Sequence, residues 1–234
     1  MQKIALVVGV GPGLGSAVAY KLLKEGYKVY ILARSENKLK EIKESLSKYG
    51  SIDYIKADAS NHKELSEALS DIKEIDALVL TVGNYKETSL DSIEDSDFSF
   101  LIDPNLKAPI NTIKALKDRI KSGSSIVLVS SIAGTYRFAE DAFLYSSIKA
   151  AVAKLTENLA AIFIEKNVRV NCVAPLSISF DFKPERDYRA DIKLASETLK
   201  PELIADVISF LLSEESYAID GAVIPVDAGA RLKL

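Results

Sequence analysis

The sequence predicts an α/β fold: a doubly wound parallel β-sheet of about seven strands with helices on both faces. Short apolar runs alternate with longer segments in which apolar residues recur every three or four positions, from the first residues to the last. The run at 75–82 is wholly apolar from Ala77 to Leu80, as expected of a parallel strand buried on both faces. Such alternation predicts right-handed crossovers, with ligands bound at the carboxyl edge of the sheet.

Length and composition are those of an ordinary soluble protein. The chain has 234 residues, which fits a single domain at 1–234. Its formal net charge of −3 gives no support for nucleic acid or an anionic membrane surface as a partner. The apolar run at 4–8 is too short for a signal peptide, and no run approaches the roughly 18 apolar residues of a membrane span. The single cysteine, Cys172, cannot form an internal disulfide, so we expect a cytoplasmic protein without a membrane segment.

The elements of the first half follow from hydrophobic periodicity. Apolar runs predict strands at 3–8, 27–33, 52–57 and 75–82. Helical spacing predicts helices at 14–25, 36–49 and 63–72, of which the first is closed by Gly26 and the second by Gly50.

The second half is less regular. The helical pattern at 95–121 contains Pro104 and Pro109, so the helix either starts near Pro104 or is kinked there. Further strands are predicted at 125–130, 168–174 and 222–226, and further helices at 145–166 and 201–213. The stretch 176–198 is polar and irregular, which predicts a loop.

Glycines follow the first strand at Gly9, Gly13 and Gly15 in a G-x-x-x-G-x-G pattern. Glycine lets the chain turn sharply and lets backbone amides approach a phosphate at a helix N-terminus. A plain turn is the alternative, but the position between a first strand and an amphipathic helix favours nucleotide binding.

Charged residues follow the second and third strands. An acidic residue after the second strand would accept a hydrogen bond from the ribose 2′-hydroxyl of NAD, but Ala33 and Arg34 stand there instead. Arg34 is suited to pairing with a 2′-phosphate; the alternative is a solvated arginine. Asp58 is suited to the adenine amino group or, alternatively, to a helix cap together with Ser60 or Asn61.

A serine, a tyrosine and a lysine form a candidate proton-transfer group. Ser131 follows a strand, and Tyr145 and Lys149 are four residues apart near the start of a helix, hence on one face. In such a group the phenol donates a proton to a carbonyl oxygen, the ammonium lowers the phenol pKa, and the serine holds the substrate oxygen. His62 is the only histidine, so we expect no metal site and no Ser–His catalysis.

Together these motifs resemble the short-chain dehydrogenase/reductase family in its classical branch, with its Rossmann-like fold, over essentially the whole chain. The matching motifs are the glycine loop, Asp58, Thr81–Gly83 in place of Asn-Ala-Gly, Asn105, Ser131, Tyr145-x-x-x-Lys149, Arg169–Asn171 with Pro175, and Val226–Gly229. The resemblance implies a catalytic set of Asn105, Ser131, Tyr145 and Lys149. It implies cofactor contacts at Gly9, Gly13, Leu14, Gly15, Arg34, Asp58, Ala59, Gly83, Tyr145, Lys149, Pro175 and Ile178.

The activity implied by this resemblance is an NAD(P)(H)-dependent oxidoreductase that interconverts a carbonyl and a secondary alcohol of a small molecule. Tyr145 would be the acid or base, Lys149 would hold the nicotinamide ribose, and Asn105 would hold a water in a proton relay. Arg34 favours NADP(H), with NAD(H) as the alternative. A 3-oxoacyl thioester on an acyl carrier protein is an alternative substrate, and a cofactor-binding sensor or assembly protein without turnover is an alternative of another class.

Residues around the site suggest its substrate and assembly. The loop at 176–198 is expected to contact substrate, and its Arg186 and Arg189 either attract an acidic substrate or carrier or are solvated. The helix that bears Tyr145 is apolar on more than one face and the family usually forms dimers or tetramers, so we expect a homo-oligomer. Apolar residues that flank the site in sequence suggest an apolar pocket: Ile132, Phe138, Phe143, Leu176, Phe180 and Phe182.

Overall fold

Seven parallel strands form the central sheet of the computed structural model, which describes residues 2–137, 139–190 and 192–233. Their order is β3-β2-β1-β4-β5-β6-β9, and each neighbouring pair is parallel. This arrangement confirms the predicted doubly wound sheet. The strands are β1 (Ile4–Val8), β2 (Lys28–Ala33), β3 (Ile52–Lys56), β4 (Ile75–Leu80), β5 (Ile120–Val129), β6 (Arg169–Pro175) and β9 (Val223–Val226).

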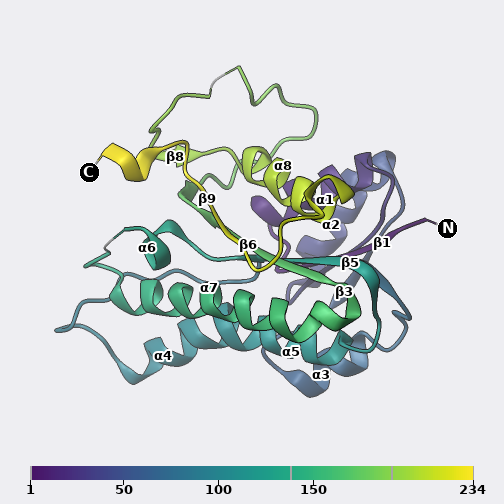
Figure 1. Ribbon diagram of the computed structural model, residues 1–234, viewed down its shortest axis with the longest axis horizontal. Coiled ribbons are helices and arrows are strands. Elements are labelled where there is room, and N and C mark those ends of the chain that lie inside the picture. The colour runs from purple at the N-terminus through teal and green to yellow at the C-terminus, as the bar shows by residue number, and fades with distance from the viewer. Residues whose placement is uncertain (1, 138, 191, 234) are drawn as a thin grey trace.

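Helices cover both faces of the sheet (Figure 1). On one face lie α1 (Leu14–Lys24), α2 (Glu36–Leu46) and α8 (Pro201–Leu212), and on the other lie α3 (His62–Ala68), α5 (Ala108–Leu116) and α7 (Phe143–Phe163). Each face of the sheet packs against its helices in a separate hydrophobic core, and successive residues of β1 point into the two cores in turn. Ala5 and Val7 lie in the core on the side of α1, and Leu6 and Val8 lie in the core on the side of α3. The central strands are therefore apolar on both sides, which is why their sequences are continuous apolar runs.

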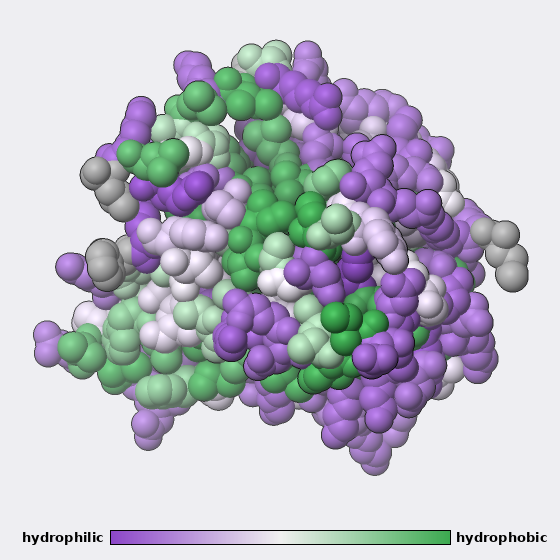
Figure 2. Space-filling view, in the orientation of Figure 1, coloured by the Kyte–Doolittle hydropathy of each residue, from purple (hydrophilic) through white to green (hydrophobic). Residues whose placement is uncertain are grey.

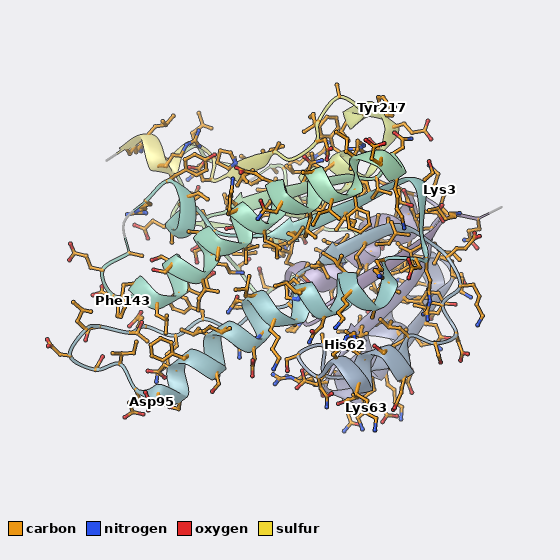
Figure 3. The ribbon with its side chains drawn as sticks, turned by 60° about the horizontal axis from the view of Figure 1, so that its bottom comes forward. Lys3, His62, Lys63, Asp95, Phe143 and Tyr217 are labelled. Atoms are coloured by element: carbon orange, nitrogen blue, oxygen red, sulfur yellow. The ribbon has the colours of Figure 1, made fainter. Side chains whose placement is uncertain are left out.

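A π-helical segment, Asp103–Lys107, joins α4 (Asp95–Ile102) to α5. The amide of Ala108 donates to the carbonyl of Asp103, five residues back, and Pro104 has no amide to donate. The kinked helix is thus the correct alternative, and a helix start near Pro104 is wrong. Figure 3 shows α4 and α5 running in succession alongside α7.

Three predicted boundaries differ clearly from those of the structure. The helix expected to reach Lys121 ends at Leu116, and β5 begins at Ile120, which pairs with Ile75 before a shift in register. Polar residues at 121–124 conceal this first part of the strand in the sequence. The third helix ends at Ala68 instead of residue 72.

Short elements complete the carboxyl edge of the sheet. They are α6 (Ile132–Thr135) and a two-stranded parallel sheet of β7 (Ser177–Ile178) and β8 (Thr198–Leu199), which joins the two ends of the loop at 176–198. Figure 2 shows apolar side chains gathered near the centre of the face turned to the viewer, where α8 and β9 lie in Figure 1. Among the described residues, no helix is long and apolar enough to cross a membrane.

Candidate active site

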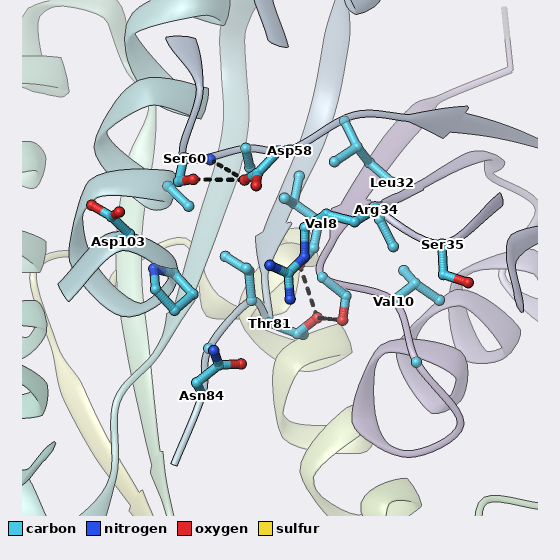
Figure 4. A pocket seen from close by; sticks show the side chains of 18 of the residues that line it. Val8, Val10, Leu32, Arg34, Ser35, Asp58, Ser60, Thr81, Asn84 and Asp103 are labelled. Atoms are coloured by element: carbon cyan, nitrogen blue, oxygen red, sulfur yellow. Dashed lines mark hydrogen bonds between the residues drawn. The ribbon is translucent and has the colours of Figure 1, made fainter. Parts of the chain in front are cut away.

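The strand order reverses at β1, which lies between β2 and β4, and a cavity of about 930 Å³ opens at the carboxyl ends of these strands (Figure 4). In a doubly wound sheet this reversal is the usual ligand crevice, because the loops after adjacent strands diverge there. The cavity is lined by the ends of four strands and by the kinked α4–α5 region. Of the predicted site residues it contains Gly9, Arg34, Asp58, Ala59 and Gly83.

The glycine loop is built for close packing. Gly9 has a φ of +92°, and a Cβ there would stand 2.3 Å from the Cα of Val82. A Cβ on Gly15 would stand 2.7 Å from the Cα of Val10. Gly13 directly precedes α1, and Phe180 packs over it, 3.2 Å from where its Cβ would be. Only glycine fits at positions 9 and 15, and Gly13 is covered by the loop at 176–198.

The ends of β2 and β3 bring Arg34 and Asp58 together. In Figure 4 Arg34 extends into the cavity beside Asp58. Burial opposes ionisation of Asp58, but hydrogen bonds from the amide and hydroxyl of Ser60 at 2.8 and 2.7 Å, with the charge of Arg34, hold its pKa below the usual range. Asn61 accepts from the amide of Glu64 and caps α3, so the cap alternative for Asp58 is wrong.

Two cavity residues near Arg34 were missed from the sequence. Ser35 directly precedes α2, and its side chain makes no capping hydrogen bond. Lys38 lies one turn into that helix and also lines the cavity. A hydroxyl, an ammonium and a guanidinium thus lie at one end of the cavity. The polar residues at positions 34, 35 and 38, directly after the second strand, are the feature of the sequence that could have indicated this group.

Thr81 follows β4 and bridges the sheet. Its hydroxyl donates to the carbonyls of Val8 at 2.9 Å and Gly9 at 3.2 Å. The threonine that stands in place of the family's asparagine therefore ties β4 to the glycine loop.

Asn105 lies in the π-helical segment and is buried. Its side-chain amide donates to the carbonyls of Asn84 at 2.8 Å and Leu101 at 2.9 Å. Its Oδ1 accepts no hydrogen bond from any described residue. A Cβ at Gly83 would stand 2.5 Å from that oxygen and 3.4 Å from Nζ of Lys149, so Gly83 separates Asn105 from Lys149.

Ser131, Tyr145 and Lys149 meet at the end of β5. The Ser131 hydroxyl accepts from the amide of Ala133 and caps α6. Burial raises the pKa of Tyr145, and the nearby Ser131 hydroxyl opposes the rise. Lys149 Nζ donates to the carbonyl of Val129 at 3.0 Å and lies 5.6 Å from the centre of the Tyr145 ring.

Burial also acts on the two ionisable groups behind the tyrosine. It lowers the pKa of Lys149 to about 8 and raises the pKa of Cys172 to about 11. The ammonium was expected to lower the tyrosine pKa, but burial outweighs any such effect and the pKa of Tyr145 is raised. Cys172 is a buried thiol of β6, as a core residue would be.

The loop at 176–198 begins beside the site. Pro175 is buried and pairs with Val226, and Ile178 pairs with Leu199. Leu14 lies in the first turn of α1, where it packs against the core below the loop. Phe180 is 81% exposed, so little beyond Gly13 covers it.

Both loop arginines form ion pairs within the chain; the solvated alternative is wrong for Arg186, whereas the Arg189 side chain is 69% exposed. Arg186 Nη2 donates to both carboxylate oxygens of Glu202 at 2.7 Å. Arg189 Nη2 donates to Asp206 at 3.0 Å, and the Tyr188 hydroxyl donates to the same carboxylate at 2.7 Å. These carboxylates belong to α8, so the loop is held on that helix.

The predicted apolar pocket is only partly assembled. Ile132 is buried in the core, and Phe182 packs on Tyr20 of α1 with ring centres 5.6 Å apart. Phe143, like Tyr145, packs against the small cluster of Leu101, Leu144 and Ile148, and Leu176 packs against the core. Phe138 lies outside the described residues. Among those described, no group of three or more His, Cys, Asp or Glu residues could hold a metal ion.

Comparisons with known proteins agree with this geometry. A family model for short chain dehydrogenases matches residues 3–189. Dehydrogenase/reductase SDR family member 4 of Rattus norvegicus is 30% identical over 248 residues, which cover 100% of this chain and 88% of that protein. A short chain dehydrogenase from Mycobacterium paratuberculosis bound to NAD superposes with a TM-score of 0.86 at 24% identity, covering 98% of both chains. A blue fluorescent protein from a metagenomic library in complex with NADPH superposes with a TM-score of 0.85 at 24% identity, covering 97% of both chains.

Proposed function

The chain belongs to the short-chain dehydrogenase/reductase family and is therefore an oxidoreductase, and we propose that it interconverts a carbonyl and a secondary alcohol with NADP(H). One observation carries the proposal: Tyr145, with its raised pKa, lies beside Ser131 and the buried ammonium of Lys149. Asn105 lies behind them with an unpartnered oxygen. A hydroxyl pair backed by a buried cation is suited to exchanging a proton with a carbonyl oxygen.

The residues act on the proton as follows. Because burial raises the pKa of Tyr145, its phenol is protonated at neutral pH and can donate to a carbonyl oxygen held by the Ser131 hydroxyl. In alcohol oxidation the same phenol oxygen accepts the proton. Lys149, whose ammonium lies 5.6 Å from the centre of the tyrosine ring, would stabilise the phenolate that proton loss leaves.

The cavity supports a nicotinamide dinucleotide as the hydride carrier, which supplies hydride to the carbonyl carbon or accepts it from the alcohol carbon. Gly9 and Gly11 line the cavity, and no atom lies within 4 Å of a Cβ added at Gly11, so the backbone of this loop is open to the approach of a pyrophosphate. The unpartnered Oδ1 of Asn105 is suited to holding a water in the proton relay.

Preference for NADP(H) rests on residues at the end of β2. Structural neighbours of this fold hold NAD or NADPH, so the choice depends on this chain's own side chains. Arg34 and Lys38 supply two positive charges, and Ser35 supplies an uncommitted hydroxyl at the start of α2. These groups suit a 2′-phosphate, and no carboxylate stands at Ala33 to accept from a ribose 2′-hydroxyl.

Ion pairing in the loop makes an acidic carrier the less favoured substrate. Arg186 is paired with Asp181 and Glu202, so its guanidinium reaches an acyl carrier protein only by breaking these ion pairs, and the exposed Arg189 is shared with Asp206. A small carbonyl compound places no such demand on the loop.

We further propose a homo-oligomer with α5 and α7 in its contacts. Ile110 on α5 is 42% exposed, and Ile162 on α7 is 69% exposed. Two large apolar side chains on adjacent helices favour burial against a second copy of the chain.

The experiment that tests the proposed activity is NADPH oxidation with a panel of aldehydes and ketones. The wild-type protein is expected to turn over, and Tyr145→Phe is expected to bind NADPH normally while losing at least about a thousandfold in kcat. The absence of turnover across the panel, or near-native turnover by Tyr145→Phe, would overturn the proposal.

A further inference from the structure

A second tyrosine contacts Tyr145. Tyr85 lies two residues after Gly83, in the segment between β4 and α4. Its ring centre is 5.0 Å from that of Tyr145, and the two ring planes meet at 84°, an edge-to-face pair. Aromatic pairs prefer this geometry over a face-to-face stack, because the positive edge of one ring meets the negative face of the other. The contact therefore favours one orientation of the Tyr145 ring.

The fold holds Tyr85 in place. The amide of Thr88 donates to the carbonyl of Asp141 at 2.7 Å, and Thr88 forms a parallel bridge with Ala142. Ala142 directly precedes α7, the helix that carries Tyr145. The segment after β4 is thus bound to the same turn that starts α7, so one set of contacts places both tyrosines.

Two further contacts hold this segment on its other side. The side-chain amide of Asn84 donates to the carbonyl of Phe100, and Lys86 forms an ion pair with the buried carboxylate of Asp97. Asp97 in turn accepts from the amide of Glu94 and completes a capping box at the start of α4. Tyr85 therefore lies between anchored residues on both sides.

The charged groups around the pair come from both segments. Glu87 and Asp141 lie near Tyr85 and, after burial, raise its pKa further. Lys149 lies against the Tyr145 ring. Tyr85 is 58% exposed, so it covers the side of Tyr145 toward solvent while Lys149 lies toward the interior.

We propose that Tyr85 is a positioning residue, whose ring holds the phenol of Tyr145 toward Ser131 and shields it from water. The inference rests on the proposed function of Tyr145. Tyr85 acts through the Tyr145 ring, so its aromatic ring matters and its hydroxyl does not. No sequence motif indicates this role, since an isolated aromatic residue after a strand has no local pattern.

Three variants test it: Tyr85→Ala removes the ring, Tyr85→Phe keeps it, and Tyr217→Ala is the control. Tyr217 is an exposed tyrosine at the opposite end of the molecule from Phe143 and the start of α7 (Figure 3). Each variant is assayed by NADPH oxidation with a short aliphatic ketone and with an aryl ketone, after NADPH affinity and thermal stability have been measured.

Tyr85→Ala is expected to lower kcat about fivefold to tenfold for both ketones, as the loss of one aromatic contact would, with NADPH affinity unchanged. Tyr85→Phe and Tyr217→Ala are expected to stay within about twofold of wild type. In alcohol oxidation, where rate rises as Tyr145 ionises, Tyr85→Ala is expected to shift this rise to lower pH, because water reaches the phenol.

Each other outcome overturns the inference. An unchanged kcat in Tyr85→Ala removes the positioning role. A loss in Tyr85→Phe as large as that in Tyr85→Ala assigns the effect to the hydroxyl. A rise in KM for the aryl ketone alone, with kcat unchanged, makes Tyr85 a substrate contact only. If wild type shows no turnover, the proposed function itself fails, and this result is distinct from active wild type with indifferent variants.

Discussion

Gly83 and Asn105 lie so close together that a Cβ atom on Gly83 would stand 2.5 Å from the Oδ1 of Asn105. This contact joins the end of β4 to the π-helical segment, and Lys149 lies against the same glycine. The relative positions of Gly83, Asn105 and Lys149 therefore depend on the absence of a side chain at residue 83.

Gly83→Ala is expected to displace Asn105, since a real Cβ never approaches an oxygen so closely. The cost of such overpacking is about 1–3 kcal/mol in the free energy of unfolding, and NADPH-dependent turnover should fall with it. Chemical denaturation measures the first effect and the carbonyl assay the second. Gly11→Ala is the control for stability, because no atom lies within 4 Å of its added Cβ. Equal stabilities for the two variants would contradict the proposed crowding.

Arg34→Ala is expected to weaken NADPH binding by about 1.5–3 kcal/mol, the range for hydrogen bonds to a charged group, and to change NADH binding little. Lys38→Ala should act in the same direction with a smaller effect. Fluorescence titration with each cofactor measures both affinities, and Lys154→Ala, outside the cavity, serves as the control. An equal loss for both cofactors would rule out recognition of a 2′-phosphate by Arg34.

Lys149→Met is expected to stabilise the protein at pH 7 while abolishing turnover. Burial lowers the pKa of Lys149 from its ordinary 10.5 to about 8, so folding costs about 3 kcal/mol while the amine must remain charged. Between pH 8 and 10.5 the unfolded chain binds more protons at this site than the folded one. The wild type therefore gains stability relative to the variant as the pH rises through that window.

Urea denaturation of the Lys149→Met variant and wild type at pH 7 and pH 10 measures this difference. The advantage of the variant should shrink at the higher pH. Lys154→Met, at an exposed lysine paired with Glu157, should show no such trend. A constant difference in the free energy of unfolding between Lys149→Met and wild type at the two pH values would mean that folding does not lower the pKa of Lys149.

Glu202→Gln is expected to loosen the loop at 176–198. Glu202 is buried, and Arg186 Nη2 contacts both of its oxygens, so neutralising it leaves the exposed Asp181, which accepts from Nη1 at 2.9 Å, as the carboxylate partner of Arg186. Losing a charge-assisted contact of this kind costs about 1.5–3 kcal/mol, and the loop should open more often.

Limited trypsin digestion measures the opening, since Arg186, Arg189 and Lys193 lie in the loop and none of them precedes a proline. Cleavage there should accelerate in Glu202→Gln. Glu157→Gln breaks an exposed pair on α7 and should leave the digestion rate unchanged. Identical digestion of the Glu202→Gln variant and wild type would show that the loop is held by other contacts.

Periodicity predicted most of the sheet because parallel strands are buried on both faces and are therefore apolar throughout. It failed at the start of β5, where Ile120 is followed by polar residues and is recognisable as a strand only from its pairing with Ile75. It also left two alternatives at Pro104. A proline alone permits both a helix start and a kink, and the bond from Ala108 to Asp103 decides for the kink.

By itself the sequence determined the alternation of strands and helices, and so the edge of the sheet at which Gly9, Arg34, Asp58 and Ser131 lie. Those properties depend on local spacing, which the chain carries in its own order. The tertiary structure alone decided that Tyr85 contacts Tyr145, and that both loop arginines are paired with carboxylates of α8. Such contacts join segments distant in the chain, and their energies depend on distance and burial, which exist only once the segments have packed.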